Sequence, residues 1–335
     1  MSQDSLAQSI DGPRLAAALR VVTRALPRFG IEADARVDPL PLSENVALRV
    51  TSRALSPVVL RISRPGARTW DELRSELAWI SALRVQSDAP VAAVVPTLDG
   101  QSLVTVEDPE TGRLSWLAAF EHVPGHEPAE AELPSVLPRL GRISAQLHEH
   151  SAQWTRPPWF ARGGWDLDAA FGPAPRWGDW RVGVPDPAQR RLVERAVQVV
   201  CERLRSFGTG PDRFGLIHAD LRTANLLVDG DDCWVIDFDD AGFGWWLYDL
   251  ATAVTFYENH PDCDEMIAAW VSGYREVRQL SDVDEHEIPT FLVFRRLLTL
   301  AFLAGNPDIE VSRDMLPGLP AQTCELAESY LLRFG

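Results

Sequence analysis

The residues with the clearest chemical potential are a histidine, an aspartate and an asparagine on one short segment, followed by a further aspartate. His218, Asp220 and Asn225 lie between two apolar runs, and Asp237 follows Asn225 by 12 residues at the end of a third apolar run. Carboxylate and amide oxygens are the ligands that Mg²⁺ prefers in proteins. Asn225 and Asp237 therefore suit a metal site, and Asp220 remains as a proton acceptor.

Two runs rich in strand-forming residues must position these side chains. The turn at 229–232 (Asp-Gly-Asp-Asp) separates residues 226–228 from residues 234–236, and this pattern predicts a β-hairpin. The hairpin would bring Asp237 back beside the other polar residues. The spacing His-x-Asp-x-x-x-x-Asn, with a later Asp closing a strand, matches the catalytic loop and metal-binding aspartate of kinases. A solvated acidic hairpin would explain the turn aspartates but not the order of the four other residues.

Length and composition limit the class of protein. With 335 residues, 46% of them hydrophobic and 24% charged, the chain can form two domains with sizeable cores. The net charge of −16 argues against nucleic acid or an anionic membrane as the partner and is compatible with a cationic substrate. All basic residues are arginines, and the four cysteines form no Cys-x-x-Cys pair. Such cysteines are typical of buried thiols in a reducing compartment.

The chain shows no pattern of a secreted or membrane protein. Residues 1–30 lack an apolar segment of the kind found in signal peptides. A run of ~18 apolar residues, which a membrane span requires, is also missing from the sequence. We therefore expect a cytoplasmic protein.

Hydrophobic periodicity predicts an α+β protein in which a small antiparallel sheet precedes a mostly helical part. A break at Val123-Pro124-Gly125 separates the two parts. The expected strands are 37–42, 47–51, 58–62, 91–97, 103–107 and 114–122. The expected helices are 13–29, 70–84, 135–150, 186–206, 247–257, 264–278, 288–303 and 318–333.

Two charged residues interrupt apolar patterns in the first part. Arg61 lies within the strand 58–62, and Glu76 lies on the apolar stripe of the helix 70–84. A buried charge is costly unless it is paired, so these two residues of opposite sign are natural partners. In the alternative, Arg61 faces solvent from an edge strand and Glu76 lies at the rim of the stripe.

The motifs at 217–225, 235–240 and 247–251, together with Arg61 and Glu76, resemble the aminoglycoside phosphotransferase/choline kinase-like superfamily. Within it, the motifs resemble those of bacterial members near the stress-response kinase A and homoserine kinase type II groups. The resemblance implies a bilobal fold like that of protein kinases. Residues 1–120 would form a nucleotide-binding N-lobe, 121–128 a hinge, and 129–335 a C-lobe with the catalytic loop and acceptor site.

The resemblance also implies roles for the matching residues. Asp220 would be the catalytic base, and Arg222 would either reach the transferring phosphoryl group or serve the structure. Asn225 and Asp237 would hold Mg²⁺ on the phosphates of ATP. His218 would brace the loop, and Asp249 of the following helix would stabilise it.

For the nucleotide, the resemblance implies a second set of residues. Arg61 would take the place of the usual phosphate-contacting lysine, a change that keeps the positive charge, and Glu76 would be its ion-pair partner. The turn over the phosphates would contain Ser43 and Asn45, although it lacks the glycine common in such turns. The backbone from Glu121 to Val123 would contact adenine.

The acceptor follows less directly from the residues. We expect a hydroxyl group on a small metabolite, cationic or aminoglycoside-like, bound by residues that follow the metal aspartate or lie in the tryptophan-rich loop 151–181. That loop could equally fix a long connection to the surface. The alternatives are a protein Ser/Thr kinase of the stress-response type and a nucleotide-binding pseudokinase scaffold. The expected acceptor-binding residues are Trp165, Asp168, Asp239, Asp240, Trp245, Trp246 and Glu258.

Overall fold

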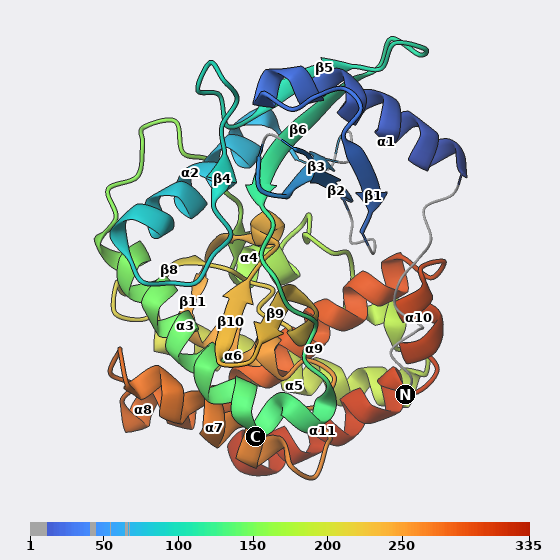
Figure 1. The fold of residues 1–335 in the computed structure, drawn as a ribbon. Helices are drawn as coiled ribbons and strands as arrows, with labels where there is room; N and C mark the ends of the chain where they lie inside the picture. The colour runs from blue at the N-terminus through green and yellow to red at the C-terminus, as the bar shows by residue number, and fades with distance from the viewer. Residues whose placement is uncertain (1–11, 41–44, 54, 64–65, 67) are drawn as a thin grey trace. The chain divides into compact units, whose positions relative to one another are not determined.

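The computed structural model describes residues 12–40, 45–53, 55–63, 66 and 68–335 (Figure 1). The chain separates into two compact units, which we describe one at a time. Unit 1 consists of Met1–Gly125, Thr155–Arg162 and Trp234–Asp239. Unit 2 consists of His126–Trp154, Gly163–Cys233 and Asp240–Gly335. The two later segments of unit 1 are not foreseen by the sequence, and the expected lobe boundaries stay a prediction.

Unit 1 is built on a six-stranded sheet in the order β1-β2-β3-β6-β4, in which β5 also pairs with β6. Every pairing in this sheet is antiparallel. The central strand β3 is almost entirely buried, as its run of Val, Leu and Ile residues predicts. The strands are β1 (Arg36–Pro39), β2 (Val46–Thr51), β3 (Val58–Ser63), β4 (Val94–Val95), β5 (Val104–Glu107) and β6 (Leu114–Glu121).

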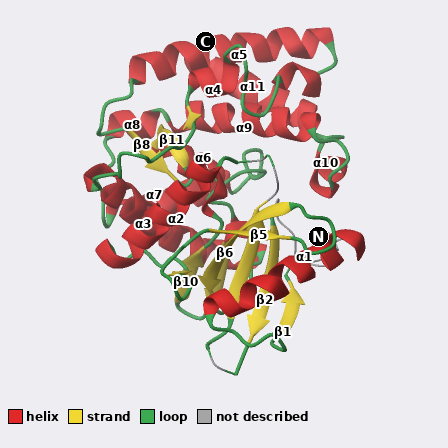
Figure 2. Cartoon of the chain, turned by 90° about the horizontal axis from the view of Figure 1, so that it is seen from above, coloured by secondary structure: helices red, strands yellow, loops and turns green. Residues whose placement is uncertain are grey.

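Two helices pack on the sheet of unit 1. Helix α1 (Gly12–Ala25) and the 3-10 turn after it (Leu26–Phe29) share one core cluster with β2 and β3, and Figure 2 shows α1 lying along the sheet. Helix α2 (Trp70–Gln86) begins at Thr69, whose side chain and that of Glu72 form the capping box that the sequence predicts. Its apolar stripe packs against β6 and the residues before β5.

Unit 2 is mostly helical. Helices α5, α9 and α11 lie side by side and form one helical layer of this unit (Figure 2). The short helices α4, α8 and α10 are absent from the sequence-based expectation. The helices are α3 (Leu133–Gln153), α4 (Leu167–Phe171), α5 (Pro187–Phe207), α6 (Trp246–Ala253), α7 (Cys263–Arg275), α8 (Asp282–His286), α9 (Ile288–Gly305), α10 (Glu310–Met315) and α11 (Leu319–Phe334).

The remaining strands frame the polar segment. Strands β9 (Leu226–Asp229) and β10 (Asp232–Val235) form the predicted two-stranded hairpin, and Gly230 in its turn has a φ of 57°, which suits glycine. Strand β8 (Phe214–Ile217) instead pairs with β11 (Gly242–Trp245), a strand that the sequence does not predict. Strand β7 (Gly164–Trp165) lies parallel to β11 on its other edge.

Helices α3 and α7 cross in backbone contact. A Cβ atom on Gly141 would lie 1.9 Å from the carbonyl oxygen of Trp270, and one on Gly273 would lie 1.8 Å from that of Pro138. Real Cβ atoms do not approach so closely, so only glycine fits at either position. This contact fixes α3, which carries His148, against α7, which carries Tyr274.

Helix α9 is the one described helix whose length and composition would also allow it to cross a membrane. Of its 18-residue apolar window, 78% is buried inside the protein. Its two charged residues, Arg295 and Arg296, are buried and paired. These features are those of a core helix.

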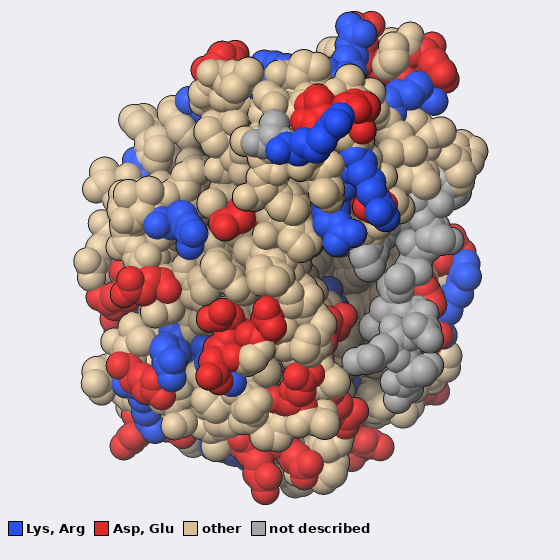
Figure 3. Space-filling view, in the orientation of Figure 1, with Lys and Arg blue, Asp and Glu red and all other residues tan. Residues whose placement is uncertain are grey.

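The predicted fold class is confirmed: an antiparallel sheet forms the N-terminal part and helices dominate the C-terminal part. On the face shown in Figure 3, acidic side chains gather over the helices of unit 2, in keeping with the net charge of −16. The four cysteines are free thiols, as expected from their spacing.

Candidate active site

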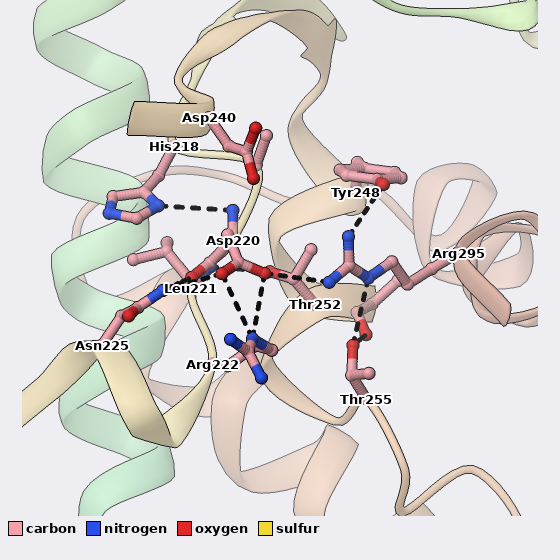
Figure 4. Close-up of polar contacts among 12 residues, drawn as sticks. His218, Asp220, Leu221, Arg222, Asn225, Asp240, Tyr248, Thr252, Thr255 and Arg295 are labelled. Carbon is pink, nitrogen blue, oxygen red and sulfur yellow. Dashed lines mark hydrogen bonds and ion pairs between the residues drawn. The ribbon is translucent and has the colours of Figure 1, made fainter. Parts of the chain in front are cut away.

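Asp220 lies in the loop after β8, and both oxygens of its carboxylate accept hydrogen bonds (Figure 4). Its Oδ1 accepts from Nη2 of Arg295 at 2.9 Å and from Nε of Arg222 at 3.1 Å. Its Oδ2 accepts from Nδ2 of Asn225 at 2.8 Å and lies 3.2 Å from the same Arg222 nitrogen. We call these four residues, all in unit 2, the Asp220 group.

The charges in this group keep Asp220 ionised. Burial alone would raise the pKa of Asp220, but the positive charges of Arg222 and Arg295 outweigh it and hold that pKa below its usual range. An ionised carboxylate can accept a hydrogen bond from a hydroxyl group and orient that oxygen for attack. Asp220 is therefore in the ionised form that such a contact requires.

The backbone of the loop is held by Asp249 of α6. The N–H of Ala219 donates to Oδ1 of Asp249 at 2.7 Å, and the N–H of His218 donates to Oδ2 at 3.2 Å. Ala219 has a φ of 67°, a left-handed conformation that residues other than glycine rarely adopt. The bonds to Asp249 offset the strain of this conformation and fix the direction in which Asp220 leaves the loop.

Asp249 is fixed in turn by His148 of α3. Nε2 of His148 lies 2.9 Å from Oδ2 of Asp249, and its Nδ1 lies 3.0 Å from the hydroxyl oxygen of Tyr274. Burial lowers the pKa of His148, although the Asp249 carboxylate opposes this effect. A neutral imidazole can donate to Asp249 and accept from Tyr274, so both ring nitrogens are satisfied. His218, also fully buried, accepts from the N–H of Asp220 at 3.3 Å.

Asn225 turns its amide nitrogen towards Asp220. Its Nδ2 donates to the main-chain oxygen and to Oδ2 of Asp220, both at 2.8 Å. The amide oxygen, which makes no hydrogen bond with the described residues, is therefore the atom available to a ligand. This orientation gives Asn225 the donor atom that a Mg²⁺ ligand requires.

Arg295 is a member of the site that sequence reasoning missed. It is 3% exposed and donates to the Tyr248 hydroxyl at 3.1 Å and the Thr255 hydroxyl at 3.2 Å, besides Asp220. Nearby Tyr248 and Asp220 raise the pKa of Arg295 against the effect of burial, so it stays charged. A signal was present: Arg295 and Arg296 interrupt an otherwise apolar helix, as Arg61 interrupts its strand.

Unit 1 contains a second charged group, around Arg61. The guanidinium donates to both carboxylate oxygens of Glu76, at 2.7 and 2.8 Å, so the predicted buried ion pair is confirmed. Nη1 of Arg61 also lies 3.8 Å from Oδ1 of Asp237. The nearby carboxylates raise the pKa of Arg61, although burial acts in the opposite direction. We call Arg61, Glu76 and Asp237 the Arg61 group.

Asp237 reaches Arg61 because the segment after β10 belongs to unit 1. The N–H of Val235 donates to the oxygen of Pro90 at 2.9 Å, and the ring of Phe238 packs edge-on against Trp79 at 5.4 Å. Asp237 has a φ of 61°, a second left-handed non-glycine residue beside a charged group. The structure thus brings Asp237 together with Arg61 and Glu76, and Asp220 together with Asn225, each set within its own unit.

The other expected nucleotide-binding residues have separate surroundings. Ser43 lies outside the described residues, and Asn45 is buried at the start of β2. The N–H of Glu121 is bonded to the oxygen of Ala93 at 2.8 Å in the sheet. Among the described residues, the N–H of Val123 has no hydrogen-bond acceptor.

The expected acceptor-binding residues divide into several environments. Asp240 and Trp165 belong together in unit 2, because the indole N–H of Trp165 donates to the main-chain oxygen of Asp240 at 2.8 Å. Asp168 is exposed on α4. Asp239 belongs to unit 1, where its main-chain oxygen accepts from Arg68 at 3.2 Å and also from Arg162.

Three of the expected acceptor-binding residues, Trp245, Trp246 and Glu258, are instead buried in unit 2. The indole N–H groups of Trp245 and Trp246 donate to the main-chain oxygens of Gly208 and Asp212, and both rings are almost fully buried. A Cβ atom on Gly215 would lie 2.0 Å from the Trp246 ring, which shows how tightly this ring packs. The carboxylate of Glu258 is already paired, because it forms a buried ion pair with Arg296 at 2.7 Å.

Three known proteins resemble this chain over most of its length. The solved structure of a microcompartment-associated aminopropanol kinase is 40% identical, has a TM-score of 0.85, and the match covers 94% of this chain and 98% of that one. The amicoumacin kinase of Bacillus subtilis (strain 168) is 26% identical over 314 residues, which are 89% of this chain and 90% of that protein. An amicoumacin kinase solved with AMP-PNP and Ca²⁺ shares the fold, with a TM-score of 0.74, 21% identity and 94% of each chain covered.

The family itself is shown by a sequence model described as "Phosphotransferase enzyme family", which matches residues 39–282. The superfamily that the motifs indicate is thus confirmed. The Asp220 group, the Arg61 group and the loop held by Asp249 all lie within the matched residues or contact them. The chain belongs to this phosphotransferase (APH) family, as a kinase that transfers phosphate to a hydroxyl group of a small-molecule acceptor.

Proposed function

We propose that the protein phosphorylates the hydroxyl group of a small amino alcohol of the aminopropanol class, with ATP as the donor and Mg²⁺ as the metal. The observation that carries this proposal is the half-buried, ionised carboxylate of Asp220 with the Asn225 amide beside it. The acceptor class is supported by the 40% identity to an aminopropanol kinase over nearly the whole chain. The net charge of −16 suits a cationic acceptor.

In this reaction Asp220 accepts a hydrogen bond from the acceptor hydroxyl and orients its oxygen in line with the γ-phosphate. One existing contact must open to make room. The side chain of Arg222 is 35% exposed, whereas that of Arg295 is 4% exposed, so Arg222 is the partner that can leave. Once released, its guanidinium would be free to offset the negative charge of the transferring phosphoryl group.

The metal would be held by the amide oxygen of Asn225 and the carboxylate of Asp237. Both are hard oxygen donors, and Asn225 already has its nitrogen committed to Asp220. The described residues contain no cluster of three or more His, Cys, Asp or Glu side chains that could bind a metal unaided. Kinase sites of this kind rely on nucleotide phosphates and water for the other ligands, and bound Mg²⁺ neutralises phosphate charge.

The nucleotide would be bound by residues of unit 1. Arg61, fixed by Glu76, offers its charge to the phosphates, and the N–H of Val123 offers a donor to adenine. Ser43 and Asn45 would cover the phosphates. A relative solved with AMP-PNP and Ca²⁺ supports a nucleotide and a divalent cation as the cofactors.

The proposal is tested by ADP release from MgATP with aminopropanol as the acceptor. The wild-type protein should turn over, and Asp220→Ala should lose roughly 10²–10⁴-fold in rate while it still binds nucleotide. The control is Asp231→Ala, which removes a fully exposed aspartate from the nearby hairpin turn and should keep full activity. Absence of aminopropanol-dependent ADP release, or full turnover by the Asp220 variant, would contradict the proposal.

Amicoumacin is a second candidate acceptor, because the chain is 26% identical to an amicoumacin kinase over most of its length. The same assay run with both compounds ranks them by kcat/KM. ADP release with a mixture of proteins as the third acceptor tests the Ser/Thr kinase alternative. The pseudokinase alternative predicts no ADP release with any of the three.

A further inference from the structure

Arg176 places its guanidinium against an aromatic ring and a carboxylate in unit 2. The guanidinium carbon lies 4.3 Å from the centre of the Trp165 ring, and Nη2 lies 3.4 Å from Oδ1 of Asp240. A cation over an indole face is attracted by the ring electrons, and a carboxylate adds a full opposite charge. Trp165 and Asp240 therefore form a ready-made site for an organic cation, occupied here by a side chain of the protein.

Arg176 fills this site poorly. Its single ion-pair contact, at 3.4 Å, is longer than the roughly 2.7–2.9 Å typical of charge-assisted hydrogen bonds. Its Nε is buried and makes no hydrogen bond within the described residues. By contrast, all three nitrogens of Arg295 donate, at 2.9–3.2 Å. Arg176 is thus a half-buried cation whose Nε is unused and whose ion pair is long, and a better-fitting cation could replace it.

The cation site lies beside the Asp220 group. Trp165 stacks on Tyr248 at 5.6 Å, and the Tyr248 hydroxyl accepts from Arg295, which also holds Asp220. Burial raises the pKa of Tyr248 to about 12, and the charges of both Asp240 and Asp220 add to this rise, so both carboxylates act on the same side chain. Figure 4 shows Asp240, Asp220, Tyr248 and Arg295 in one cluster.

The guanidinium can leave without disturbing the backbone that carries it. The N–H of Arg176 donates to the oxygen of Ala169 at 2.7 Å, which fixes the main chain to α4. The side chain itself is 17% exposed, while the Trp165 ring beneath it is fully buried. A change of side-chain rotamer would therefore uncover the indole face and the carboxylate together.

We propose that the ammonium group of the acceptor binds between Asp240 and the face of Trp165, where it displaces the guanidinium of Arg176, while Asp220 holds the acceptor hydroxyl. This inference rests on the proposed function and makes it more specific. Arg176 then competes with the acceptor for this site. This competition lowers the affinity of the protein for acceptors whose cationic group binds weakly. Acceptors that join an ammonium to a hydroxyl by a short carbon chain would reach both carboxylates at once.

The experiment compares KM values for aminopropanol and for propanediol of the same carbon skeleton, with saturating MgATP. Asp240→Asn should raise the ratio of the aminopropanol KM to the propanediol KM about tenfold, the usual effect of losing one charged contact. Arg176→Ala and Arg176→Gln should both lower this ratio several-fold, because the internal competitor is gone. Two variants at this position guard against a folding defect in one of them.

The matched control is Arg181→Ala. Arg181 also lies over an indole, that of Trp180 at 4.9 Å, and pairs with Asp179 and Glu194. Its removal changes the net charge by the same amount and should leave the KM ratio unchanged.

Three results would overturn the inference. An unchanged ratio in the Asp240 and Arg176 variants, with both acceptors still phosphorylated, leaves the proposed function standing and removes the ammonium site. A selective loss of activity towards a hydroxy amino acid in Arg176→Ala would mean that Arg176 binds an acceptor carboxylate. Wild-type protein that phosphorylates neither alcohol would remove the proposed function and this inference together.

Discussion

In unit 1 a single arginine, Arg61, is surrounded by carboxylates, whereas in unit 2 a single carboxylate, Asp220, is surrounded by arginines and an asparagine. The Arg61–Glu76 pair in the first group is closed. Nη1 and Nη2 of Arg61 each donate a hydrogen bond to Glu76. The side chain of Arg61 is 9% exposed and that of Glu76 is 0% exposed. The second group is open on one side, because Arg222 is far more exposed than the other partners of Asp220.

This difference separates two tasks that charged groups perform in a site. A bidentate ion pair whose two side chains are buried from solvent keeps its geometry, because breaking it leaves an unpaired buried charge. A carboxylate with one exposed partner can exchange that partner for a ligand at small cost, because exposed ion pairs contribute little stability. We infer that the Arg61 group presents a fixed charge and that the Asp220 group is built to change contacts.

The largest effect should come from breaking the closed group. Glu76→Ala leaves the Arg61 charge buried without its main partner, and the free energy of unfolding should fall by about 3–5 kcal/mol. Urea unfolding followed by tryptophan fluorescence measures this loss. Replacing both residues, as in Arg61→Met with Glu76→Leu, should recover most of the stability but not nucleotide binding.

A loss below about 1 kcal/mol in Glu76→Ala would mean that the pair behaves like a surface ion pair. In that case the contrast between a closed and an open group would fail. Nucleotide binding retained by the double variant would instead show that Arg61 does not contact the phosphates.

A smaller effect should follow from removing the buried partner of Asp220. Arg295→Met deprives Asp220, Tyr248 and Thr255 of one hydrogen bond each, and we expect a loss of about 1–3 kcal/mol in unfolding free energy. The kcat should fall about tenfold, the size of one misplaced charged contact, with little change in the KM for ATP. An unchanged kcat would remove Arg295 from the positioning of Asp220.

Arg295→Lys sharpens this test. Lysine keeps the positive charge, but its single nitrogen cannot reach three acceptors from one rotamer. We therefore expect a kcat between those of the wild type and Arg295→Met. A kcat equal to that of the wild type would mean that charge alone matters at this position.

The smallest effect concerns the residues behind Asp220. Burial lowers the pKa of His148, which faces Asp249 and Tyr274 and also feels the charge of Arg278. The folded state therefore binds this proton less readily than the unfolded chain, whose histidines titrate near ~6.5. The stability that His148 contributes is present above that pH and is lost as the pH falls, by at most ~1.4 kcal/mol per pH unit.

Urea unfolding between pH 8 and pH 5 measures this slope in the wild type and in His148→Gln, which should show a shallower slope. The matched control is His126→Gln, because the His126 side chain is 59% exposed and its Nε2 contacts the Glu132 carboxylate at the surface. Equal slopes in the wild type and in His148→Gln would contradict the assignment of a neutral buried histidine.

The Arg61–Glu76 pair was predictable because its signal is local. Arg61 and Glu76 are 15 residues apart on neighbouring elements, and each interrupts an apolar pattern of its own. Arg295 produces the same kind of signal in α9, but its partner Asp220 is 75 residues away in sequence. Periodicity shows that a buried charge needs a partner, but it does not identify a partner that only the packing of several helices brings close.

The strands around Asp220 show the same limit. The hairpin β9–β10 follows from its Asp-Gly turn, whereas β11 is a run of Gly, Phe, Gly and Trp without a clear alternation. Because the sequence does not predict β11, we expected Trp245 and Trp246, which follow Asp237 in the sequence, to line the acceptor site. The pairing of β8 with β11 instead directs both rings into the core.

The attachment of the catalytic loop to α6 has a consequence for how this protein can diversify. Asp249 shapes the loop from α6, whereas the proposed cation site draws Trp165 from β7 and Arg176 from the residues after α4. On the proposed assignment, substitutions at 163–178 would change which acceptor is recognised without moving Asp220. New acceptors would then be gained by changes in the 163–178 segment, while the loop held by Asp249 stays as it is.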